Sequence, residues 1–442
     1  MADLPLAAFM VPALFLLIFL GIPVSFSLIV VSVGFALMAV GDLAGLQLYR
    51  FVGSVASNYA LAAVPLFIFM GAMLEGSGMA ARLFALMKRW FGRLPGGMSI
   101  ATIAMCTVFA AGTGIVGAVE VMVGLLAIPA MMREGYDRRI ISGVICAGGS
   151  LGTMIPPSIV VIIYASAANQ SVGDLFAAVL APGAIMVALF IAWVVIHGLF
   201  LHHPKPEDVA EAVPGDGPAE LTDASVFSLL PPLILVFMVV GSIMAGIAAV
   251  TEAAAVGAVG AVLLNILYRD FNWQRFGQAT LKTVMVTSMI LLIVVGGTLF
   301  TSVFRLTGGA GLVRDLVNAS DLSSMQLTLM FLVVVFILGA LLDWVSVVLI
   351  AVPIFLPFLA PNGIDAVWFA VLVIIMLQTS YLTPPMAPSI FYLRSIAPPS
   401  FSYSDMYLGV LPFVVCQLIV LVLVFLFPGL ATAIPDYLIS VR

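Results

Sequence analysis

Two proline pairs, each flanked by hydroxyl residues, lie inside strongly apolar runs and could form a binding site. They occur in Ser150-Leu151-Gly152-Thr153-Met154-Ile155-Pro156-Pro157-Ser158 and in Ser380-Tyr381-Leu382-Thr383-Pro384-Pro385-Met386-Ala387-Pro388-Ser389. Proline lacks an amide hydrogen and clashes with the preceding turn, so neither run can continue as one helix. The freed carbonyls need protein, a solute or a cation as a partner at membrane depth. A kink without a ligand is the alternative for one break, but the repetition favours a site.

The helix ends at the two breaks have opposite polarity. The second half-helices begin near Ser158 and Ser389 and can face an anion, while carbonyls and hydroxyls that end the first half-helices can hold Na⁺. Glycines in two further apolar runs permit close backbone approach, although they could equally serve helix packing. The predicted sodium ligands are Gly112, Thr113, Gly152, Thr153, Pro156, Gly339, Asp343, Thr383 and Met386.

Three acidic residues, Glu120, Glu252 and Asp343, lie in apolar runs that contain no lysine or arginine. Such acids are candidates for a functional site, and the alternative is a carboxyl that is protonated or bonded to a helix end. Asp343 falls at a predicted turn, where it could meet a cation or substrate. A helix-capping role competes for Thr251 and Glu252. The predicted substrate-contacting residues are Ser158, Asp343, Ser346, Thr251, Glu252 and Ser389.

The composition indicates a helical membrane protein with many spans. Charged residues make up 8% of the 442 residues, hydrophobic residues make up 63%, and the net charge is only -5. A soluble domain has roughly 25% charged residues. The basic residues form no nucleic-acid footprint, and the chain has no HExxH, GxSxG or Walker motif, so we expect neither nucleic-acid binding nor an enzyme.

The elements that position these residues can be placed in two halves joined by a linker. Residues 1–201 contain a hairpin that enters and leaves the membrane on one side (98–132) and a broken helix (140–165). Residues 202–225 are hydrophilic and predicted to be a cytoplasmic linker. Residues 226–442 contain a polar segment from Arg269 to Lys282, a separate span from Thr283 to Phe304, a second hairpin (326–359), a second broken helix (366–396) and a last span from Met406 to Phe427.

The two halves align as repeats. Arg82 matches Arg314 at an offset of 232, and Thr153 matches Thr383 at an offset of 230. Each repeat is expected to have about five spans and one hairpin, and an odd number of crossings inverts the second repeat. The basic residues then lie mostly inside, which predicts that both termini are periplasmic. The predicted fold is an all-α polytopic membrane protein with two inverted repeats and discontinuous helices at its centre.

Several motifs in chain order resemble the large membrane subunit (DctM type) of tripartite ATP-independent periplasmic (TRAP) transporters. They are residues 149–158, the run Thr251-Glu252-Ala253-Ala254-Ala255-Val256-Gly257-Ala258, and Thr383-Pro384-Pro385. The resemblance implies sodium-driven import of a small organic anion, such as a carboxylate, across the bacterial inner membrane by an elevator motion. It also implies two partners, a small four-helix membrane subunit (DctQ type) and a periplasmic substrate-binding protein (DctP type), and no cofactor besides Na⁺ as the coupling ion.

Two other functions remain open at the level of the sequence. A self-sufficient sodium/anion symporter of similar repeat design would take up its substrate without a binding protein. A passive channel would also use broken helices, but its transport rate would be indifferent to a sodium gradient.

Overall fold

The computed structural model describes residues 5–76, 79–114, 116–200, 230–320 and 322–441, and every regular element in these ranges is a helix. Within these ranges, eight helices are long and apolar enough to cross a membrane. The prediction of an all-α protein with many membrane spans is therefore confirmed. The predicted linker, 202–225, lies outside the described residues. The division into two inverted repeats stays a prediction.

The first part of the chain forms α1 (Ala7–Phe19), α2 (Val24–Val40), η1 (Gly41–Leu43), α3 (Ala44–Ala56), η2 (Tyr59–Ala62), α4 (Ala63–Gly76), α5 (Met79–Phe91), α6 (Gly97–Thr113), α7 (Val116–Arg133), α8 (Arg138–Ser150), η3 (Leu151–Thr153), α9 (Ile159–Ala168) and α10 (Val172–Phe200). The second part forms α12 (Leu230–Met244), α13 (Val250–Leu267), α14 (Trp273–Leu306), α15 (Gly309–Ser320), α16 (Ser324–Leu341), α17 (Trp344–Leu359), η5 (Ala360–Asn362), α18 (Ala366–Leu382), α19 (Pro388–Ile396), α20 (Tyr403–Leu426) and α21 (Gly429–Val441).

Both proline pairs interrupt a helix. The first separates η3 from α9, and the second separates α18 from α19. At the first, the chain tightens into a 3-10 turn, η3, before the prolines. At the second, Thr383 is extended and Ala387 adopts a left-handed conformation with φ 38° just before α19 begins at Pro388. The missing amide hydrogens of the prolines account for both breaks.

Several helices that surround the breaks begin at a polar capping residue. Asp137 accepts the Arg139 N–H at 3.0 Å, Asp365 accepts the Trp368 N–H at 2.7 Å, and Ser402 accepts the Asp405 N–H at 3.1 Å. These bonds satisfy donors that the first turn of a helix leaves free. The starts of α8, α18 and α20 are therefore fixed by local sequence.

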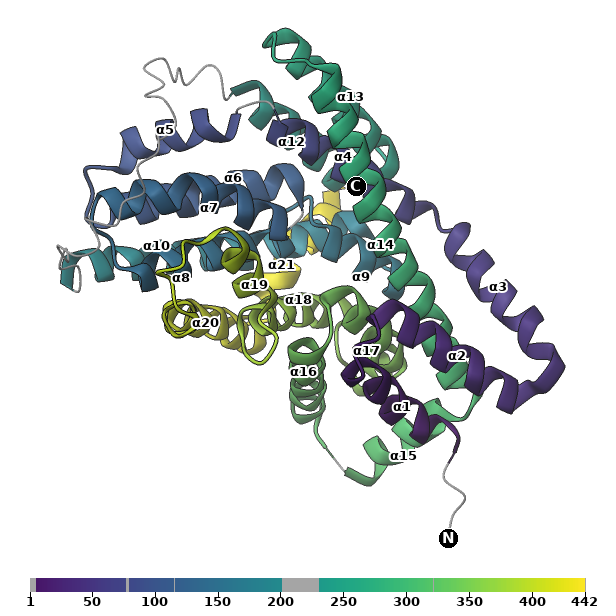
Figure 1. Cartoon of the computed structure of the whole chain (residues 1–442). Helices are drawn as coiled ribbons and strands as arrows, with labels where there is room; N and C mark the ends of the chain where they lie inside the picture. Colours follow the sequence, from purple (N-terminus) through teal and green to yellow (C-terminus); the bar gives the residue numbers. More distant parts are fainter. Residues whose placement is uncertain (1–4, 77–78, 115, 201–229, 321, 442) are drawn as a thin grey trace.

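The α6–α7 pair and the α16–α17 pair each pack against a half-helix from the other part of the chain. α7 contacts α19, and α17 contacts α9. Figure 1 shows α18 near the middle of the molecule, where it contacts α16, α20 and α10. The two parts of the chain therefore share one core.

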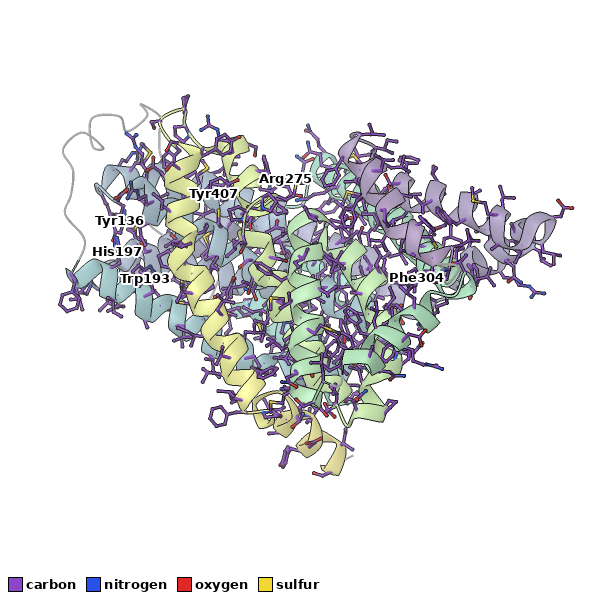
Figure 2. All side chains as sticks on the ribbon, turned by 90° about the horizontal axis from the view of Figure 1, so that it is seen from below. Tyr136, Trp193, His197, Arg275, Phe304 and Tyr407 are labelled. Carbon is purple, nitrogen blue, oxygen red and sulfur yellow. The ribbon has the colours of Figure 1, made fainter. Side chains whose placement is uncertain are left out.

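Tyr136 links the two ends of the α6–α7 pair. It lies between α7 and α8, is labelled in Figure 2, and its hydroxyl accepts the N–H of Met98 at 3.3 Å. Burial raises the pKa of Tyr136. The phenol therefore keeps its proton at neutral pH while its oxygen accepts this bond.

The longest helix, α14, contradicts the expectation of a polar segment followed by a separate span. It runs without interruption for 34 residues. The polarity changes along it, but it contains no proline, and its glycines cost only about 1 kcal/mol each in a helix. Figure 1 shows α14 along the right side of the view, where it packs against α2, α3 and α4. Arg275 and Phe304 mark its two ends in Figure 2.

Candidate functional site

A central cavity of about 370 Å³ lies between the two helix pairs, the two broken helices and α14. Its lining comes from the start of α2, the connection after α6 and the start of α7, the connection between α16 and α17, the end of α18, the starts of α9 and α19, and the middle of α14. The lining residues are Pro23, Val24, Ser25, Gly114, Val116, Gly117, Ile159, Val286, Met289, Ile290, Ile293, Gly339, Leu342, Asp343, Trp344, Val345, Leu377, Ser380, Tyr381, Pro388 and Tyr392. Among these described residues there is one acid and no lysine, arginine or histidine.

Asp343 is held in place at the start of α17. Its Oδ2 accepts the Ser346 N–H at 3.1 Å, and its Oδ1 accepts the Ser346 hydroxyl at 2.6 Å. Ser346 itself is fully buried and does not line the cavity. Ser346 therefore positions the carboxylate, and Asp343 can present its remaining lone pairs to a ligand.

The first break lies against the connection between α6 and α7. Gly114 has φ 60° and packs on Pro157 and Ile159, while a Cβ on Gly152 would lie 3.7 Å from the Val116 backbone. This contact requires a residue without a side chain in a left-handed conformation.

The hydroxyls at the first break donate to nearby carbonyls. Thr153 Oγ1 donates to the Ser150 carbonyl at 2.9 Å, and Ser158 Oγ donates to the Thr153 carbonyl at 2.6 Å. Thr113, in the facing helix, donates to the Phe109 carbonyl at 3.0 Å. Each hydroxyl oxygen keeps lone pairs that can face a cation. The structure thus brings Thr113, Gly152 and Thr153 into one region.

The second break lies beside the α16–α17 connection and is more open than the first. A Cβ on Gly339 would lie 2.9 Å from the Ser380 Cβ, which places this connection against the end of α18. Thr383 Oγ1 donates to the Thr379 carbonyl at 2.7 Å. Met386 is 48% exposed, whereas Pro156 and Pro157 are buried. Of the predicted ligands near this break, Gly339 and Asp343 line the cavity, whereas Thr383 and Met386 do not.

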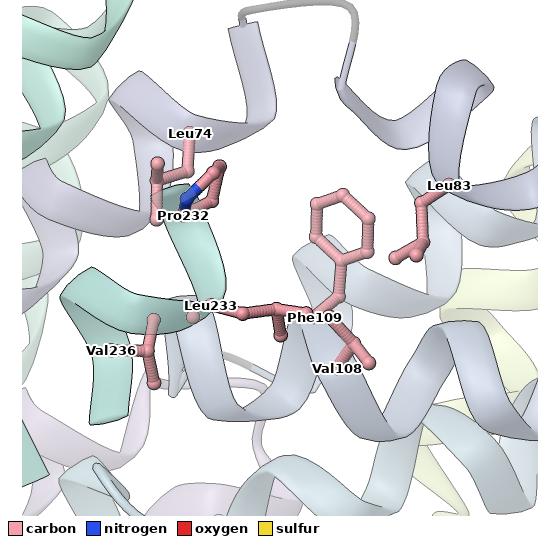
Figure 3. Close-up of a pocket in the computed structure, with 8 residues that line it drawn as sticks. Leu74, Leu83, Val108, Phe109, Pro232, Leu233 and Val236 are labelled. Atoms are coloured by element: carbon pink, nitrogen blue, oxygen red, sulfur yellow. The ribbon is translucent and has the colours of Figure 1, made fainter. Parts of the chain in front are cut away.

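Gly112 faces away from the central cavity. It lines a separate pocket of about 20 Å³ in which all other lining side chains are apolar; they come from α4, α5, α6 and α12 and are Leu74, Leu83, Val108, Phe109, Pro232, Leu233 and Val236 (Figure 3). A Cβ on Gly112 would lie 3.6 Å from Leu74 Cδ1. This side of Gly112 serves helix packing.

The remaining predicted substrate residues lie outside the cavity lining. Glu252 is exposed, and its Oε2 accepts the Ala249 N–H at 3.0 Å, so its contact is a helix-start contact. Thr251 is buried beside it in α13. Ser389 Oγ donates to Glu120 Oε1 at 2.7 Å, which joins α19 to α7. Of the six predicted substrate residues, only Asp343 borders the cavity.

The sequence reading missed several cavity residues. Tyr381 directly follows Ser380 within the second proline motif, and Gly117 lies just after the first glycine-rich connection, so both were within reach of the motif argument. Tyr392 packs on Gly117, where a Cβ would lie 2.8 Å from its ring. The wall formed by Val286, Ile290 and their neighbours in α14 carries no local signal.

A buried polar cluster outside the cavity lining connects the two broken helices. Ser150 Oγ accepts hydrogen bonds from Gln378 Nε2 at 3.1 Å and from Gln417 Nε2 at 3.3 Å. All three residues are fully buried. Buried polar groups of this kind fix how helices pack, so α8, α18 and α20 are held in register.

A solved structure has the same fold. The crystal structure of the Alcanivorax borkumensis YdaH transporter, described as having an unusual topology, aligns with a TM-score of 0.63 at 16% identity and covers 89% of this chain and 90% of that one. The likeness concerns the helical architecture alone.

Sequence comparisons extend over nearly the whole chain. The C4-dicarboxylate TRAP transporter large permease protein DctM of Pseudomonas aeruginosa is 30% identical over 387 residues, covering 86% of this chain and 87% of that protein. The sialic acid TRAP transporter large permease protein SiaM of Vibrio cholerae is 29% identical over 422 residues, covering 95% and 96%. These relatives are transporter permeases rather than enzymes. The family model of the tripartite ATP-independent periplasmic transporter, DctM component, matches residues 11–430, and the chain therefore belongs to this family.

Proposed function

We propose that the protein imports a small organic anion, such as a carboxylate, together with sodium ions, by an elevator motion. The observation that carries this proposal is the central cavity, because it is bordered by both helix breaks, by both short interhelical connections and by α14. Discontinuous helices at the centre of a membrane protein are typical of substrate and ion sites in secondary transporters.

The charge of the cavity favours sodium as the coupling ion. Its described lining contains Asp343 and no basic residue. An anion beside this carboxylate is repelled unless cations lie between them, because the repulsion between like charges is strong in a poorly solvated site. Sodium bound by the carbonyls, hydroxyls and Asp343 supplies this positive charge.

The substrate is delivered by a periplasmic binding protein, and a small membrane subunit completes the transporter. Membership of the DctM family supports both partners. Relatives named for C4-dicarboxylates and for sialic acid have nearly the same identity to this chain, 30% and 29%. Overall identity therefore does not select the substrate, and a thermal-shift screen of the cognate binding protein against organic acids is the direct way to name it.

Uptake into proteoliposomes tests the proposal. The full chain and its small subunit are reconstituted, and the loaded binding protein is added outside with an inward sodium gradient or with choline in place of sodium. We expect accumulation only with sodium and only with the binding protein. Undiminished uptake in choline would refute sodium coupling, and sodium-driven uptake without the binding protein would identify a self-sufficient symporter.

A further inference from the structure

Glu120 is a buried carboxyl group to which the proposed transport cycle assigns no role. It lies in α7 with no exposed surface. Its Oε1 accepts the Ser389 hydroxyl at 2.7 Å, and its Oε2, in the described part of the chain, has no hydrogen-bond partner. It also packs on Gly149 of α8, where a Cβ would lie 2.9 Å from Oε1. The side chain therefore joins α7 to two other helices, α8 and α19, and one of its carboxyl oxygens has no hydrogen-bond partner among the described residues.

The ionisable groups around Glu120 supply no positive charge. Cys106 of α6, Cys146 of α8, Tyr381 of α18 and Tyr392 of α19 are close enough to interact with it electrostatically. Thiols and phenols are neutral or negative, never cationic. The adjoining 3-10 turn, η3, has no ionisable side chain.

The basic residues of α5, the remaining helix that packs on α7, do not pair with Glu120. α5 contacts α7, but its Arg82 pairs with Asp270 at 2.8 Å, its Lys88 pairs with Glu134 at 2.9 Å, and its Arg89 is exposed. The arginines of α8 and α19 are also bonded elsewhere: Arg138 to the Ser400 carbonyl, Arg139 to Asp405 and Arg394 to the Phe401 carbonyl. Within the described residues, Glu120 thus has no cationic partner. A buried carboxylate without a cation is strongly disfavoured, and two occupants could neutralise it, a proton or a metal ion.

The number of oxygen atoms favours the proton. Hard cations take about six oxygen ligands. Here the nearby side-chain oxygens are those of Glu120, Ser389, Tyr381 and Tyr392, which are fewer than six, and the other close groups are the Gly149 backbone and two thiols. A proton on Oε2 removes the charge, and the single O–H donor that it creates costs far less to bury than an unpaired charge.

We propose that Glu120 is a proton-binding site that joins the α6–α7 pair to the second broken helix. In its neutral form the carboxyl accepts the Ser389 hydroxyl and packs without an unpaired charge, so proton binding favours the contact between α7 and α19. Tyr381 and Tyr392 both border the central cavity. The proton therefore lies directly behind the cavity wall.

Infrared difference spectroscopy of the purified full chain tests protonation without any transport assay. The wild type minus Glu120→Gln difference should contain the carbonyl band of a protonated carboxylic acid at neutral pH. The control is Glu134→Gln, which changes an exposed carboxylate and should remove no such band. Ser389→Ala should shift the band to higher frequency by removing its hydrogen bond, whereas Ser395→Ala, on the same helix and exposed, should leave it in place.

The pH dependence of stability provides a second measurement. If the folded protein retains this proton and the unfolded carboxyl releases it, stability falls as pH rises through the range in which an exposed glutamate ionises. Release of this one proton on unfolding raises the equilibrium constant for unfolding about tenfold for each pH unit. We expect the wild type to lose stability between about pH 5 and pH 8 more steeply than Glu120→Gln, by up to this factor.

The outcomes are decisive in both directions. A carboxylate band in place of the acid band would overturn the proposal, and so would equal pH slopes for the two proteins. An acid band that disappears when sodium is added would assign the site to sodium instead. If Glu120→Gln does not fold, the frequency of the acid band in Ser389→Ala tests the proposal: a shift to higher frequency supports it, and an unshifted band contradicts it. None of these results depends on transport, so a failure here is distinct from a failure of the sodium-coupled uptake assay.

Discussion

Gly339 lies directly against Ser380, where a Cβ on residue 339 would be 2.9 Å from the Ser380 Cβ. This contact holds the connection between α16 and α17 against the end of α18, and both residues border the central cavity. The position of Asp343 at the cavity therefore depends on residue 339 having no side chain.

Gly339→Ala is expected to destabilise the protein and to reduce uptake. The added methyl group must displace Ser380, and overpacking of this kind costs about 1–3 kcal/mol. Thermal unfolding in detergent and uptake into proteoliposomes measure the two effects. Gly311→Ala is the control, because a Cβ there meets nothing within 4 Å. Equal melting temperatures for both variants would contradict the close contact.

Thr153→Val and Thr383→Val are each expected to raise the sodium concentration that gives half-maximal uptake. Each change removes one oxygen beside a helix break but keeps the volume of the side chain. Thr280→Val is the matched control, since Thr280 makes the same kind of bond to a carbonyl of its own helix, at 2.9 Å, and is exposed. If sodium dependence is unaltered in both variants at the breaks, the ion site lies elsewhere.

The predicted inversion of the repeats requires the two helix pairs to open toward opposite sides of the membrane. In a cysteine-free background, an impermeant maleimide should label Ala360→Cys from the periplasmic side and Arg93→Cys only from the cytoplasmic side. Both positions are exposed, at the outer ends of the α16–α17 and α6–α7 pairs. Right-side-out and inside-out vesicles provide the comparison. Labelling of both residues from the same side would rule out the inverted arrangement.

Thr301 joins α14 to α17, and its removal should weaken this contact. Its hydroxyl donates to the Leu349 carbonyl at 2.7 Å, whereas Thr283, also in α14, donates to the Ala279 carbonyl of its own helix at 2.8 Å. A hydrogen bond between buried groups contributes about 1 kcal/mol. Thr301→Val should therefore lower the melting temperature more than Thr283→Val does. The reverse order would show that the bond between the helices contributes little.

The breaks were predictable because proline acts on the backbone within one turn. The same local reasoning placed Asp343 at a turn, and in the structure it is the residue directly before α17. This reasoning failed for α14, where a change of polarity was taken as a boundary although no residue there interrupts a helix, and it did not predict α21. The pairing of Glu120 with Ser389 connects residues 269 positions apart in sequence, and no local pattern carries that information.

The length of α14 links the shape of the central cavity to the thickness of the lipid bilayer. At 34 residues the helix is about 51 Å long, against a hydrocarbon core of about 30 Å. Trp273, which is 76% exposed and packs with Phe271 and Phe276, is an aromatic anchor of the kind that stays at the membrane interface. In a thinner bilayer the helix must tilt further. Because Met289 and Ile293 of this helix form one wall of the cavity, we expect the acyl-chain length of the surrounding lipid to change the volume of the cavity.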